Sequence, residues 1–197
     1  MKKLLALLIL VIAAFSIYWF VFKSKGGGDD GPKQQPLTLK KHSLEFNTSV
    51  LTAMNAYFEI QNALADADTT NAKNACKKFI GLLDSIKLDE LKKDTASIFE
   101  TAQANLNDAK ANAASLLNQT DITEMRQDFN MVSQMLYPSF FKSINYEGPK
   151  MYWQTCPMAF GADKSASWIS NKVDILNPYL GKSHTDCGEI QDTIKTQ

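Results

Sequence analysis

The stretch VLTAMNAYFEIQNAL, residues 50–64, decides the fold predicted for this chain. Its large apolar side chains recur at spacings of three and four residues, which places them on one face of a helix. They are Val50, Leu51, Met54, Tyr57, Phe58 and Leu64. The stretch therefore predicts an amphipathic helix whose apolar face needs other helices to cover it.

The same helical spacing continues to about residue 141. Residues 66–70 break the first helix and offer N-cap candidates for the second. A third helix is expected from near Leu88 to Leu117, and a fourth begins at Thr120 or Asp121 and is limited or kinked by Pro138. Because the connections are short, consecutive helices should pack antiparallel. Residues 44–141 thus predict an up-and-down four-helix bundle in an all-α chain.

On the N-terminal side, Leu4 to Phe22 form an apolar run of nineteen residues without a charge. The run is long enough to span a bilayer and longer than the core of most cleaved signal peptides. We predict a transmembrane anchor at residues 1–23, with a cleaved signal peptide as the alternative. Residues 24–36, rich in glycine and proline, predict a flexible linker. Residues 37–197 would then be exported: the protein is expected in the inner membrane with this domain in the periplasm, or secreted to the periplasm.

Composition and motifs argue against two classes of function. The formal net charge is zero, and four lysines flank the apolar run, so the exported part is mildly acidic. Binding to nucleic acid is therefore not expected. We also expect no enzyme, because the sequence has no assignable catalytic triad, no phosphate-binding glycine loop and no Cys-x-x-Cys motif.

Two single residues of the bundle have ordinary structural interpretations. Cys76 lies close to the apolar face of the second helix and is expected to be an inert buried thiol. Arg126 is the only arginine of the chain, and we expect it to form a salt bridge on the bundle.

From about residue 144 the helical period fades, and turn residues alternate with large aromatic residues. Residues 144–197 therefore predict an irregular segment packed on the bundle. Four of its side chains are expected either to shield a site or to pack the segment: Trp153, Trp168, Asn177 and Tyr179.

The sulfur residues of this segment suggest a metal site. Cys156 and Met158 are two positions apart, and an extended backbone would turn both to one face. His184 and Cys187 are three apart, which makes them neighbours on one turn. If the two pairs meet, the thiolates, thioether and imidazole form a soft set suited to copper(I). A Cys156–Cys187 disulfide is the alternative in an oxidising compartment, and the spacing leaves both open.

Several short motifs together resemble the DUF3347 family, whose members are periplasmic and also occur as a module on copper/silver efflux adaptor proteins. The motifs are ALADADTTNAKNAC (63–76), MRQDFNMVSQML (125–136), CPMAF (156–160), WIS (168–170), NPYLGK (177–182) and CG (187–188). The resemblance covers roughly residues 45–194. It implies an exported helical domain with a suspected role in copper or heavy-metal handling, and Cys156, Met158 and Cys187 match the family's sulfur positions. Relatives often carry Met where this chain has His184.

With this resemblance, the predicted function is a membrane-tethered periplasmic metal-binding domain that handles copper(I) or another heavy metal. Its expected partners are efflux-pump or metal-trafficking proteins. The alternative is a disulfide-stapled structural or protein-interaction domain without metal.

Overall fold

The computed structural model describes residues 41–94, 96–182, 184 and 186–195. The predicted anchor and linker lie outside these residues. Within the described part of the chain, no helix is both long and apolar enough to cross a membrane.

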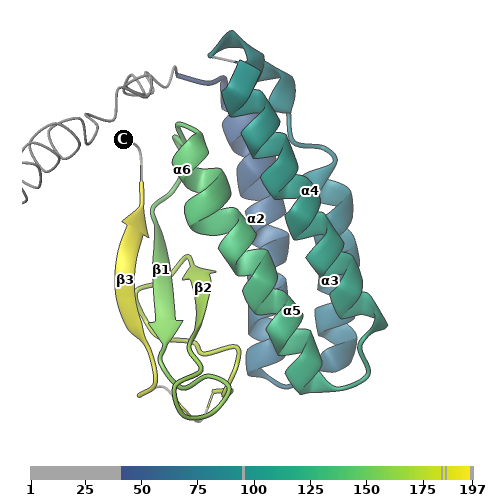
Figure 1. The fold of residues 1–197 in the computed structure, drawn as a ribbon, viewed down its shortest axis with the longest axis vertical. Helices are drawn as coiled ribbons and strands as arrows, with labels where there is room; N and C mark the ends of the chain where they lie inside the picture. Colours follow the sequence, from purple (N-terminus) through teal and green to yellow (C-terminus); the bar gives the residue numbers. More distant parts are fainter. Residues whose placement is uncertain (1–40, 95, 183, 185, 196–197) are drawn as a thin grey trace, which may run out of the picture. The chain divides into compact units, whose positions relative to one another are not determined.

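Four α-helices form the larger part of the fold (Figure 1). They are α2 (Leu44–Ala65), α3 (Thr69–Leu83), α4 (Ala96–Asn118) and α5 (Ile122–Gln134). Ser43, Asp68 and Asp121 are the N-caps of α2, α3 and α5, and each side chain accepts a backbone N–H of the first turn. Of the two starts predicted for the fourth helix, Thr120 and Asp121, the structure has Asp121 as the N-cap.

The helices differ from the prediction at two places. Residues 88–93 form a separate 3-10 helix, η1 (Leu88–Lys93), so the third helix begins only at Ala96. After α5 a π-helical turn, η2 (Met135–Phe140), leads into the short α6 (Phe141–Ser143). The kink expected from Pro138 is present, because Tyr137 has φ −137° and ψ 131°. Proline disfavours helical geometry at the residue before it.

The core of the bundle contains the apolar stripe predicted for the first helix except Leu51, which is half-buried. The Tyr57 ring stacks on Phe129 with centroids 4.9 Å apart. Cys76 is fully buried, as expected, and its thiol donates to the carbonyl of Ala113 over 3.1 Å. Burial raises the pKa of this thiol to about 12, which keeps it protonated and unreactive.

The all-α prediction is wrong, because the C-terminal segment contains a three-stranded antiparallel sheet in the order β2-β1-β3. The strands are β1 (Met151–Cys156), β2 (Ala166–Ser170) and β3 (Glu189–Ile194). Gln154 pairs with Trp168 on β2 and with Ile190 on β3. Strands of five or six residues are too short to show a clear period among so many turn residues.

The sheet joins the bundle through the edge of β2. The backbone N–H of Ser167 donates to Asn130 Oδ1 over 3.1 Å, and that of Ile169 donates to the Tyr57 hydroxyl over 3.0 Å. These bonds occupy the side of β2 that faces away from β1. β2 therefore lies next to α5, and β3 is the outer strand (Figure 1).

Candidate functional site

Cys156 and Cys187, the two predicted thiolate ligands, are joined in a disulfide. Cys156 ends β1, and Cys187 lies two residues before β3. Their Cα atoms are 5.4 Å apart and 31 positions apart in sequence. Cys156 has no exposed surface and Cys187 only 9%. The bond closes a long loop that begins and ends at the sheet.

The other two predicted ligands, Met158 and His184, are exposed. The same-face argument for Cys156 and Met158 needs an extended backbone, but β1 ends at Cys156 and Met158 is in a turn, 57% exposed. His184 is also exposed, and its Nδ1 lies 3.1 Å from the carbonyl oxygen of Leu180. In the described ranges, no group of three or more histidine, cysteine or acidic residues is arranged to hold a metal ion.

Asn177 and Tyr179, predicted to shield a site or pack the segment, organise the loop that the disulfide closes. The Asn177 amide donates to the carbonyl of Cys187 over 2.8 Å, and its oxygen accepts the N–H of Tyr179 at 2.8 Å. The Tyr179 hydroxyl donates to the carbonyl of Ser167 on β2 over 2.5 Å. These bonds tie the loop to both the disulfide and the sheet.

The two tryptophans pack in different places. Trp168 is fully buried, and its ring lies 5.8 Å from that of Tyr179. Trp153 is half-buried on the central strand, 5.2 Å from the ring of Tyr137. The Tyr137 hydroxyl donates to the carboxylate of Asp192 on β3, and this bond lowers the pKa of that carboxyl.

A cavity of about 630 Å³ lies between α5 and the loop that follows β1. Arg126 is on its bundle side, Phe160 and Lys164 are in this loop, and Tyr179 comes from the connection between β2 and β3. The expected salt bridge of Arg126 is not formed in the described part of the chain. Its Nη2 instead donates to the carbonyl of Leu64 over 3.0 Å, near the end of α2. Sequence reasoning singled out this arginine but did not associate it with a cavity.

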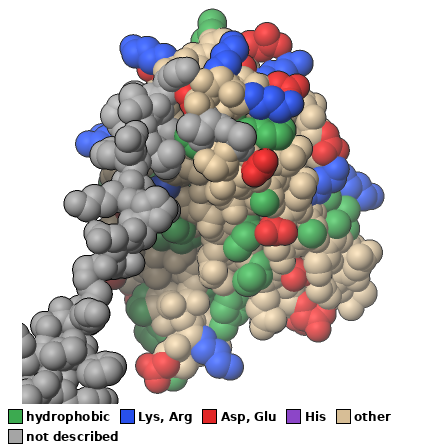
Figure 2. All heavy atoms as spheres, turned by 45° about the horizontal axis from the view of Figure 1, so that its top comes forward, with side chains coloured by type: hydrophobic (Ala, Val, Ile, Leu, Met, Phe, Trp, Pro, Cys, Tyr) green, Lys and Arg blue, Asp and Glu red, His purple; other side chains and the backbone are tan. Residues whose placement is uncertain are grey.

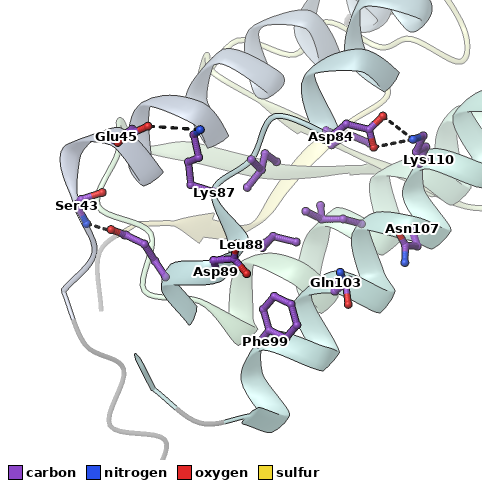
Figure 3. Close-up of a pocket in the computed structure, with 14 residues that line it drawn as sticks. Ser43, Glu45, Asp84, Lys87, Leu88, Asp89, Phe99, Gln103, Asn107 and Lys110 are labelled. Atoms are coloured by element: carbon purple, nitrogen blue, oxygen red, sulfur yellow. Dashed lines mark hydrogen bonds and ion pairs between the residues drawn. The ribbon is translucent and has the colours of Figure 1, made fainter. Parts of the chain in front are cut away.

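A second cavity, of about 490 Å³, lies where η1 and α4 meet the start of α2 (Figure 3). Here the lysines are neutralised by carboxylates. Lys110 lies 2.6 Å from Asp84, and Lys87 lies 3.6 Å from Glu45. Figure 2 likewise shows lysines and acidic residues interspersed over the visible face. The two lysines of this cavity therefore form ion pairs within the protein.

His42, which the sequence places at the start of the domain, lies beside this cavity and not with the cysteines. Its side chain is only 3% exposed, with Nε2 3.5 Å from Asp94 and Nδ1 4.0 Å from Glu90. The Glu90 carboxylate also accepts the backbone N–H of Ser43 at 3.0 Å, which lowers its pKa. The sequence showed no signal for this buried cluster, because its members are far apart in the chain.

Residues 53–146 match the model of the family described as protein of unknown function DUF3347. The resemblance drawn from the motifs is thereby confirmed for this segment. Neither the curated proteins nor the solved structures include a match to the chain. The matched segment contains Arg126 and ends before β1, so both cysteines of the disulfide lie outside it.

Proposed function

We propose that this chain is a non-enzymatic protein-interaction domain, stapled by the Cys156–Cys187 disulfide and exported to the periplasm. The disulfide is the observation that carries the proposal. A metal-binding cysteine acts as a thiolate, and a sulfur in a disulfide is not one. Disulfides persist in oxidising compartments, which agrees with the export predicted from the apolar run at residues 4–22.

The surface we propose for the partner is the outer edge of β3. Its residues 189–192 are exposed, including Ile190 at 40%. Among the described residues β3 pairs only with β1, so its other edge offers backbone N–H and C=O groups. An extended segment of a partner protein recognises such an edge by adding a strand, with Ile190 as an apolar contact.

Thiol counting combined with a copper(I) titration of the full chain tests the metal-free part of this proposal. Without reductant, the denatured chain should show one thiol, Cys76, and bind no copper tightly. Three thiols in the chain as isolated from its host would contradict the staple. So would one tightly held copper(I) per chain that is lost in Met158→Leu, since this outcome would favour the metal-binding alternative.

Site-specific photo-crosslinking in the native host tests the interaction surface. A crosslinker at Ile190 should give a discrete adduct with one protein, whereas a crosslinker at Lys77, exposed on α3, is the matched control. A synthetic peptide of the crosslinked segment should then bind the purified chain and protect β3 amides from hydrogen exchange. Equal adducts at both positions, or binding without protection of β3, would contradict the proposed edge.

A further inference from the structure

The cavity between α5 and the loop after β1 differs from the cavity in Figure 3 in whether its cationic side chains form ion pairs with carboxylates. In the described part of the chain, no carboxylate lies within 4.0 Å of the Arg126 guanidinium. The same holds for Lys164. Asp121 acts on Arg126 only at longer range. By contrast, Lys110 and Lys87 in the other cavity each have a carboxylate partner.

The remaining charge at the cavity does not compensate for these two cations. Asp128 is its single lining carboxylate, and Gln119 donates to that carboxylate over 2.8 Å. Burial lowers the pKa of Arg126, but a guanidinium stays charged at neutral pH. The cavity therefore holds two cations against one carboxylate, and it favours an anion.

Arg126 is also held in place before any ligand arrives. It is half-buried, and its hydrogen bond to the carbonyl of Leu64 ties it to the end of α2. A guanidinium fixed in this way loses little conformational entropy when it binds a carboxylate, which it recognises with directed N–H groups.

The rest of the cavity supplies apolar surface. The half-buried Phe160 ring packs edge-on against Tyr179, with centroids 5.4 Å apart. On the α5 side, Met131 is 41% exposed. The Tyr179 hydroxyl is already bonded to Ser167, so this residue presents its ring. An aromatic or aliphatic group is thus the body that fits beside the cations.

We propose that this cavity binds a carboxylate carried on an apolar or aromatic body, with Arg126 and Lys164 contacting the carboxylate and Phe160 and Met131 contacting the body. The inference goes beyond the proposed function, since it concerns a ligand-sized cavity and not the edge of β3. A free aromatic acid and a polypeptide C-terminus ending in an aromatic residue share this chemistry.

Binding of two matched pairs of probes to the full chain, with its disulfide intact, tests the proposal. The first pair is phenylacetate and its neutral analogue phenylacetamide. The second is a short peptide ending in phenylalanine, with a free or an amidated C-terminus. In ligand-observed NMR titrations the carboxylate member should bind about tenfold or more tightly, as expected for a charge-assisted contact. If only the acid binds, the ligand is a free organic acid; if only the peptide binds, it is a polypeptide C-terminus.

Three variants assign the binding to this cavity. Lys164→Gln should weaken carboxylate binding several-fold without changing stability, because this exposed side chain makes no ion pair within the described residues. Arg126→Gln should weaken binding about tenfold or more, with its fold checked by circular dichroism. Lys110→Gln, in the other cavity, is the control and should leave the affinity for the carboxylate probes unchanged. Equal binding of acid and amide, no binding of any probe at millimolar concentration, or unchanged affinity in both cavity variants would overturn the proposal.

Discussion

In the four helices most backbone N–H groups donate within their own helix, whereas in the C-terminal region buried side chains form hydrogen bonds with the backbone of the segments that connect the paired strands. Gln154 is fully buried on β1, and its amide donates to the carbonyls of Lys172 and Val173 over 3.1 and 3.2 Å. The Asn177 amide donates to the carbonyl of Cys187, and its side-chain oxygen accepts the backbone N–H of Tyr179. The comparison indicates that stability of the bundle is spread over many residues, whereas that of the stapled sheet depends on a few.

Trp168→Ala should have the largest effect, since this fully buried ring fills the space between the sheet and Tyr179. We expect a loss of about 3 to 5 kcal/mol in the free energy of unfolding, measured by urea denaturation. Val173→Ala, in a loop residue that is 58% exposed, is the control and should change stability by less than about 0.5 kcal/mol. Similar values for the two variants would show that the sheet region contributes little to the common core.

Replacing Cys156 and Cys187 together by alanine should cost about 3 to 4 kcal/mol, because the loop of 31 positions gains freedom in the unfolded chain. The comparison predicts that hydrogen-exchange protection falls first in β1 and β3, with α2 and α3 retaining theirs. Cys76→Ser, which alters the bundle only, should leave the protection of the sheet unchanged. A simultaneous loss of protection in all elements would mean that the two regions unfold as one unit.

Tyr57→Phe tests the joint between the regions. The hydroxyl accepts the N–H of Ile169 on β2 and bonds Ser133 on α5 over 2.7 Å. Its removal leaves a buried N–H without an acceptor and should cost about 1 to 3 kcal/mol in thermal unfolding. Ser133→Ala removes only the partner in the bundle, so its cost should be smaller. A larger loss in Ser133→Ala than in Tyr57→Phe would mean that the Tyr57 hydroxyl stabilises the bundle alone and not its contact with the sheet.

The smallest effect should come from Asp192, which connects β3 to the turn after α5. The bond donated by Tyr137 lowers the pKa of this carboxyl below its ordinary value of 3.8, so the charged form is favoured in the folded protein. Its contribution is therefore complete above that value and is lost as the pH falls below it. Because the side chain is 47% exposed, we expect less than about 1 kcal/mol. Stability measured against pH should fall less steeply at the acid end in Asp192→Asn, and an unchanged slope would contradict this role.

The helices could be predicted because their signals are local. Asp121 can be recognised as an N-cap from the residues next to it in the sequence, and Pro138 predicts a break in the helix within one turn. The sheet could not be predicted in the same way. β3 pairs with β1 across more than thirty residues, and its own exposed residues carry no alternation of polar and apolar positions. The cavity was missed for a similar reason, since Arg126 and Lys164 line the same cavity only when the loop after β1 packs next to α5.

The sequence by itself determined the helical bundle, its caps and the two alternatives for the sulfur residues, because helical periods, capping residues and ligand types are readable within a few positions. Only the tertiary structure decided how those residues are used. It pairs Cys156 with Cys187 because the ends of β1 and β3 meet, with Cα atoms 5.4 Å apart. It leaves Met158 on an exposed turn because β1 ends two residues earlier. Distances between remote segments depend on how strands pair and loops close, and no local pattern encodes them.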